Sequence, residues 1–166
     1  TLVDSYTTAM AMGFHVTSAA KAAAQGASVS DCKKIAEDAQ KTSGVFFVVD
    51  TLEFLHRGGR IGGGRRFLGS ALNIKPILTV GDGKVEAAGS VRTKAKAVNH
   101  IVELVHEQCK GKNNVHLATL HANAEQEAKE LLKTVGQGLN VVESVLSEVS
   151  PAIGTHTGPG TVGLAF

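Results

Sequence analysis

Two glycine-rich segments of this 166-residue chain hold the side chains best suited to chemistry. The basic segment, residues 56–66, reads HRGGRIGGGRR and contains four arginines and no acid. The histidine segment, residues 154–160, reads GTHTGPG and adds two hydroxyl groups and an imidazole. Glycine lets backbone N–H groups approach a ligand closely, and guanidinium groups pair with carboxylates and phosphates. Together the segments predict a site for a small anionic group, a carboxylate or a phosphate.

The basic segment has alternative interpretations. RNA-binding tails contain Arg-Gly-Gly repeats, but this segment is single, has apolar flanks and lacks interleaved aromatic residues for base stacking. A P-loop would need Gly-Lys-Ser/Thr, and a dinucleotide fold would need Gly-x-Gly-x-x-Gly between a strand and a helix. We expect Arg65 and Arg66 to be solvated. Arg60, held among glycines, is expected to face an anionic group or an acidic partner surface.

The histidine segment places His156 between Thr155 and Thr157, so that a ring N–H and two hydroxyl groups can meet one anion. A hydrolase triad is not supported, because the chain has no Gly-x-Ser-x-Gly motif. Cys32 and Cys109 are far apart and have no metal-ligand spacing. We therefore expect no catalytic residues and no metal, and both cysteines are expected to be small buried side chains in a reducing compartment.

The composition is that of an ordinary globular protein, with 43% apolar and 19% charged residues. The net charge is only +2, so the basic character is local. A membrane-spanning run of about 18 apolar residues and a secretory leader pattern are both missing from the sequence. These features predict a cytoplasmic protein. The first residue is Thr1 rather than methionine, and we expect a fragment or a processed product.

Hydrophobic periodicity predicts the elements that position the two segments. Helices are predicted over residues 5–25, after the capping-box pattern that begins at Ser28, and over residues 93–109. A further helix is predicted after Asn123, and Asp82-Gly83 predicts a hairpin turn. The predicted strands are residues 45–49, 74–80, 84–91, 115–120, 141–149 and a short last one at 163–166.

This order of elements predicts an α/β domain over residues 44–166. A hairpin followed by two strand–helix units favours a mixed, largely antiparallel sheet with helices packed on one face. Residues 1–43 are predicted to be helical and have no complete core of their own. We therefore treat residues 1–43 as a separate helical part.

Several motifs in series resemble the DegV family of bacterial fatty-acid-binding proteins, over essentially the whole chain. The matching stretches are Val3-Asp4-Ser5, Met12-Gly13, residues 48–55, 57–62, 68–70, 72–78 and 82–85, Val91-Arg92-Thr93 and residues 153–160. The resemblance implies two α/β domains that hold one long-chain fatty acid between them, with the acyl tail in an apolar tunnel and the carboxylate at a polar end.

The resemblance further implies a binding protein that is not an enzyme and needs no cofactor. Its members present the carboxylate to a separate ATP-dependent fatty acid kinase, which makes an acyl phosphate for phospholipid synthesis. By position, His156 matches the histidine that binds the carboxylate or the phosphate, and Thr155 and Thr157 are further polar contacts. Arg60 and Arg92 match the two arginines linked to productive interaction with the kinase.

The tunnel wall has no motif of its own. Candidates from adjacency are apolar residues near the matching motifs, and ordinary core packing is an equal alternative for each. They are Phe67, Leu68, Leu72, Ile74 and Ile77.

The chain departs from the family pattern in two ways. Residues 1–43 correspond only to the last helices of an N-terminal α/β domain, so the hydroxyl groups expected opposite His156 are not in this truncated chain. Exposed apolar faces on such a remnant predict self-association or pairing with a missing N-terminal fragment. The pair Arg65-Arg66 is more basic than the family pattern.

One alternative function stays open. The chain would then be an interaction module without lipid that binds an acidic protein or nucleic acid through the basic segment, although we expect no nucleic acid partner. Binding to nucleic acid would weaken with salt.

Overall fold

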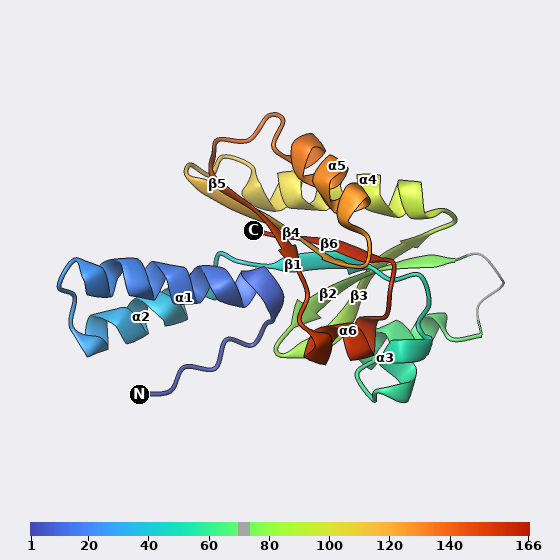
Figure 1. Cartoon of the computed structure of the whole chain (residues 1–166), viewed down its shortest axis with the longest axis horizontal. Coiled ribbons are helices and arrows are strands. Elements are labelled where there is room, and N and C mark those ends of the chain that lie inside the picture. Colours follow the sequence, from blue (N-terminus) through green and yellow to red (C-terminus); the bar gives the residue numbers. More distant parts are fainter. Residues whose placement is uncertain (70–73) are drawn as a thin grey trace.

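The computed structural model describes residues 1–69 and 74–166, which form one mixed sheet with helices on both faces (Figure 1). Its strands are β1 (Val45–Val48), β2 (Lys75–Gly81), β3 (Lys84–Val91), β4 (Val115–Ala122), β5 (Val141–Glu148) and β6 (Thr161–Ala165). They lie in the order β3-β2-β1-β6-β4-β5. The β4–β5 pair is parallel and the other pairs are antiparallel. The predicted mixed, largely antiparallel sheet is confirmed.

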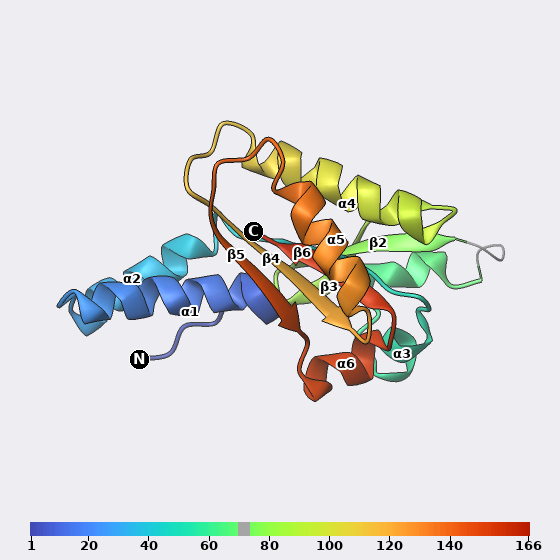
Figure 2. The same ribbon diagram turned by 45° about the horizontal axis from the view of Figure 1, so that its top comes forward.

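The helices lie on both faces of this sheet, not on one as the sequence analysis predicted (Figures 1 and 2). They are α1 (Ala9–Ala24), α2 (Val29–Ala39), α3 (Glu53–Arg57), the 3₁₀ helix η1 (Gly62–Phe67), α4 (Lys94–Cys109), α5 (Glu125–Val135) and α6 (Pro151–Thr157). The physical reason is visible in β1, whose residues alternate between two apolar clusters. Val48 belongs to the cluster under α4, whereas Val45 and Phe47 belong to the opposite cluster. A strand that is apolar on both sides must be covered on both sides.

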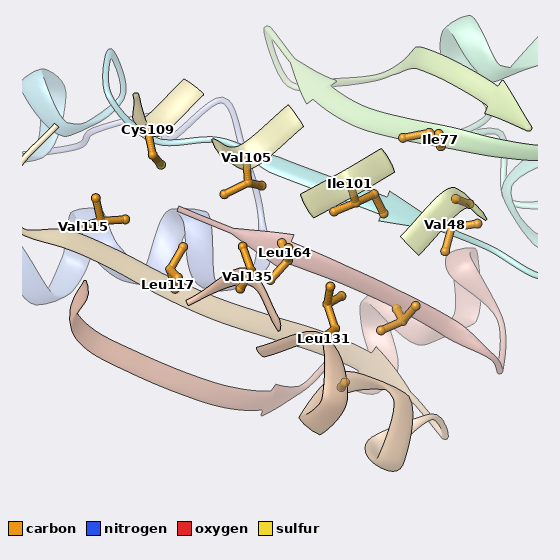
Figure 3. Packing of buried hydrophobic residues seen from close by; sticks show 13 residues of the cluster. Val48, Ile77, Ile101, Val105, Cys109, Val115, Leu117, Leu131, Val135 and Leu164 are labelled. Atoms are coloured by element: carbon orange, nitrogen blue, oxygen red, sulfur yellow. The ribbon is translucent and has the colours of Figure 1, made fainter. Parts of the chain in front are cut away.

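One core cluster lies between the sheet and helices α4 and α5 (Figure 3). Helix α4 contributes Ala97, Ile101, Val105 and Cys109, four residues apart, and this spacing puts them on one helix face. Burial raises the pKa of the Cys109 thiol, in keeping with its expected role as a small apolar side chain. This half of the core follows from the periodicity of α4.

Helix α1 covers part of the other face, where Ala11 and Phe14 are buried among strand residues. Helix α2 packs on α1 and begins with the predicted capping box, in which Ser28 and Asp31 bond to each other's backbone N–H groups. Helix α1 is thus packed on the sheet of residues 44–166. The division of the chain at residue 43 stays a prediction.

The end of the chain contains two features that the sequence did not reveal. No helix was predicted after Pro151, but residues 151–157 form α6, with Pro151 in its first turn. The last strand, β6, is central in the sheet, between β1 and β4. In residues 1–69 and 74–166, no helix is both long and apolar enough to cross a membrane.

Candidate functional site

The two glycine-rich segments lie against each other, because glycines on each side allow close approach. A Cβ atom at Gly58 would overlap with Nδ1 of the His156 imidazole. A Cβ atom at Gly158 would overlap with the ring of Phe54, on α3. Gly158 also has φ = +77°, a conformation that glycine adopts without strain. The joint site predicted from the two segments therefore has a structural basis in α3 and α6.

A pocket of ≈ 270 Å³ lies beside the two segments, over the sheet face that α1 partly covers. Strands β1 to β4 supply part of its walls, α6 supplies another part, and residues 7–9 at the start of α1 also line it. The apolar walls include Val45, Phe47, Leu55, Val80, Val85 and Leu120. An apolar ligand segment would therefore be removed from water in this pocket.

Polar groups from both glycine-rich segments line the same pocket: Arg60, His156 and Thr157. The Arg60 side chain is exposed, and its Nη1 donates a hydrogen bond to the carbonyl of Gly58 at 2.8 Å. The Nδ1 atom of His156 is buried and has no hydrogen-bond partner among the described residues. This atom lies against Gly58, so a contact from the imidazole to a ligand would come from another edge of the ring, in a pocket that Arg60 also lines.

Thr157 is buried, and its hydroxyl group donates to the carbonyl of Ile153 at 3.4 Å. Thr155 is exposed and is not among the lining residues. Arg92 is also exposed, directly after β3, and lies outside the pocket. The structure thus brings Arg60, His156 and Thr157 together and leaves Thr155 and Arg92 on the surface.

The described tunnel candidates do not line this pocket. Ile77 is fully buried in the cluster under α4, on the other side of the sheet. Phe67 is half-buried, and Leu68 and Ile74 are 39% and 38% exposed. Leu72 lies outside the described residues.

The residues that do form the walls were missed by the sequence analysis. They come from alternate positions of separate strands, such as Val45 and Phe47 on β1. That alternation was available in the sequence as a signal for one strand face. Which faces meet, however, depends on the strand order, which the sequence pattern does not contain.

Two other arginines of the basic segment, Arg57 and Arg66, have local partners. Arg57 lies 2.6 Å from Glu53 in an exposed ion pair, and Arg66 donates to the carbonyl of Ala87 at 3.0 Å. The Arg66 guanidinium also lies 5.0 Å from the centre of the Phe67 ring. Residues 1–69 and 74–166 contain no group of three or more His, Cys, Asp or Glu residues arranged to hold a metal ion. Arg60 is therefore the arginine of this segment that faces the pocket.

The fold and the site define an α/β protein with a largely apolar pocket that an imidazole and an arginine side chain also line. The family described as uncharacterised DegV-family proteins matches residues 1–166. The chain belongs to the DegV family.

Relatives and solved structures support this assignment. A DegV domain-containing protein of Clostridium perfringens is 41% identical over 165 residues, which are 99% of this chain and 58% of that protein. A DegV family protein of Thermus thermophilus, described as binding fatty acid, has 36% identity and a TM-score of 0.94 over 99% of this chain and 59% of its own. DegV of Bacillus subtilis, described as a fatty acid binding protein, has 34% identity and a TM-score of 0.86 over 98% and 58%. The chain thus spans somewhat more than half the length of these relatives.

Proposed function

We propose that this chain binds a long-chain fatty acid, with the acyl tail in the apolar pocket and the carboxylate at His156 and Arg60. The observation that carries the proposal is that the His156 imidazole and the Arg60 side chain line one pocket whose walls are otherwise largely apolar. Each buried methylene group of the tail contributes about 0.8 kcal/mol. The descriptions of the Thermus and Bacillus relatives favour this ligand class.

The polar groups fit a carboxylate better than a neutral head group. The Arg60 guanidinium offers several N–H donors in a fork, and a ring N–H of His156 can donate to the same anion. Thr157 lines the same pocket, and its hydroxyl group would have to leave the carbonyl of Ile153 in order to donate to the carboxylate. Thr155 remains a candidate for a contact from outside the pocket.

We also propose that the bound carboxylate is presented to a separate fatty acid kinase in the cytoplasm, which makes an acyl phosphate for phospholipid synthesis. The chain itself performs no chemistry in this scheme. Exposure of Arg60 and Arg92 supports the proposal, since a partner can reach both side chains. Guanidinium groups would pair with an acidic surface of the kinase or with the phosphate that it transfers.

Native mass spectrometry of the purified chain tests the fatty acid proposal. We expect bound acyl chains of one or a few masses, released by solvent extraction. The variant Val80→Phe places a larger side chain in the pocket wall and should carry much less lipid. Val142→Phe, at an exposed position of β5, is the matched control and should carry as much lipid as the wild type.

Two results would count against the proposal. One is a wild-type chain without lipid that also fails to take up added palmitate. The other is a salt-sensitive affinity for RNA in the same lipid-free protein, which would favour the interaction module instead.

A further inference from the structure

Asp50, two residues after the end of β1, lies between the histidine segment and the first residues of α4 and β2. Its Oδ2 atom lies so close to Gly160 that a Cβ atom there would overlap with the carboxylate. Its Oδ1 atom lies 3.4 Å from Nζ of Lys94 and 3.7 Å from Nζ of Lys75. The Lys75 ammonium also donates to the backbone carbonyl of Asp50 at 3.0 Å. One carboxylate thus contacts the histidine segment and the first residues of α4 and β2.

The two lysines are more shielded from water than most ion-pair partners on this protein. The side chains of Lys94 and Lys75 are 21% and 27% exposed, and Lys94 reaches on to Glu127 of α5 at 3.0 Å. Single exposed pairs contribute little, whereas a network of several charges with partial burial holds its geometry better. The network therefore ties Asp50 to α4 and, through Lys94, to α5.

The charges around Asp50 connect the histidine segment with the start of α4, which follows Arg92. Gly160 ends the histidine segment, only four residues after His156. Lys94 is the first residue of α4, two residues after Arg92. Asp50 is not among the residues that line the pocket. Asp50 can therefore affect a ligand in two ways, through its charge at a distance or through the residues that it holds.

We propose that Asp50 is a positioning residue, which fixes the histidine segment for carboxylate binding and holds it in register with the start of α4 beside Arg92. This inference rests on the proposed fatty acid site. It makes a prediction of definite sign, because Asp50 carries a negative charge. Removal of a nearby negative charge alone would strengthen binding of an anion. Loss of positioning weakens it.

The test compares a fatty acid with the alcohol of equal length, which lacks the carboxylate. Affinities for palmitate and hexadecanol are measured by displacement of a fluorescent fatty acid from wild type and from Asp50→Asn. We expect palmitate to bind about ten-fold more weakly, equivalent to about 1.4 kcal/mol, and hexadecanol to change by less than about two-fold. Palmitate affinity that is unchanged or higher, or an equal loss for both ligands, overturns the proposal.

Two further variants make the result specific. Lys94→Gln removes the same contact from the other side, and its effect should not add to that of Asp50→Asn in the double variant. It also keeps the test open if Asp50→Asn does not fold. Asp38→Asn, on α2, removes exposed ion pairs with Lys34 and Lys41 and should leave both affinities unchanged.

A measurement without lipid separates this inference from the proposed function. The imidazole resonances of His156 are recorded by NMR in wild type and in Asp50→Asn, and are assigned with His156→Gln. We expect them to shift or broaden in Asp50→Asn and to stay unchanged in Asp38→Asn. If the wild type binds neither ligand, the proposed function fails. In that case unchanged His156 resonances in Asp50→Asn overturn the positioning role as well.

Discussion

At the level of single residues, the contact between Gly58 and His156 explains why a glycine stands at this place in the basic segment. Gly58 has φ = −76° and ψ = −4°, which any L-residue adopts, so the backbone does not require glycine there. The requirement comes from the imidazole, which occupies the space of a Cβ atom. Neighbouring Gly59 is the reverse case, because it has φ = +70° and open space around its Cα.

Alanine substitutions at Gly58 and Gly59 give a matched test of the contact between Gly58 and His156. Gly58→Ala should displace the His156 imidazole and weaken palmitate binding by about ten-fold or more, as judged by fluorescent displacement. Gly59→Ala should destabilise the fold by about 1–2 kcal/mol in urea unfolding, through backbone strain, with palmitate affinity nearly unchanged. If Gly58→Ala binds palmitate like the wild type, the imidazole is not a ligand contact.

The polar candidates lie nearer to the pocket than the apolar ones. Arg60 and His156 both line it, although the family resemblance implied a partner contact for Arg60, and the role of each residue stays a prediction. The apolar candidates were chosen because they adjoin a motif in the chain. The actual walls, such as Phe47 and Leu120, are neighbours across the sheet and not along the chain. Strand order, set by long-range packing, decides which side chains meet.

At the level of elements, local patterns gave reliable helices and strands but not their places in the fold. The capping box at Ser28 and the turn at Asp82-Gly83, where both residues have positive φ, appear where the sequence predicted them. Pairing of β6 between β1 and β4 had no local signal. Its Gly163 lies so close to Phe47 and to the backbone of Phe46 that a Cβ atom would overlap with them. Such contacts are set by the whole sheet.

The contact between α1 and β5 should contribute to the free energy of unfolding in a way that depends on pH. Glu143 on β5 accepts hydrogen bonds from His116 at 2.7 Å and from Lys21 of α1 at 3.1 Å. These bonds, with His116 first, hold the pKa of the Glu143 carboxyl below its ordinary value. The unfolded chain therefore takes up this proton at higher pH than the folded chain does. The stabilisation is present above the ordinary glutamate pKa of about 4.3 and is lost as the pH falls through the lower folded value.

Urea unfolding of wild type and Glu143→Gln at pH 7 and pH 4 measures this effect. We expect the wild type to be the more stable at pH 7, by less than about 1 kcal/mol because the groups are partly exposed, and the gap to narrow at pH 4. Glu107→Gln on α4 is the control, since Glu107 is exposed and has no ion pair among the described residues. A gap that grows toward pH 4 would contradict this account of α1.

At the level of the whole molecule, the proposed ligand would contact elements from most of the sequence. The pocket is lined by residues as distant in the chain as Thr7 and Thr157, and by strands from both sides of β1. A ligand that binds only the folded arrangement stabilises all of these elements together. Ligand binding should therefore appear as a shift of one cooperative unfolding transition, and not as the protection of one helix.

Thermal unfolding with added palmitate tests this coupling. At a free concentration of about 100 times the dissociation constant, binding contributes about 2.7 kcal/mol. For a chain of this length that corresponds to a rise in midpoint of roughly 5–10 °C. Val80→Phe should show a much smaller rise, because its side chain takes the place of the acyl tail. An equal rise in the midpoint of wild type and of Val80→Phe would mean that palmitate binds elsewhere on the protein, because only the wild-type pocket has room for the acyl tail.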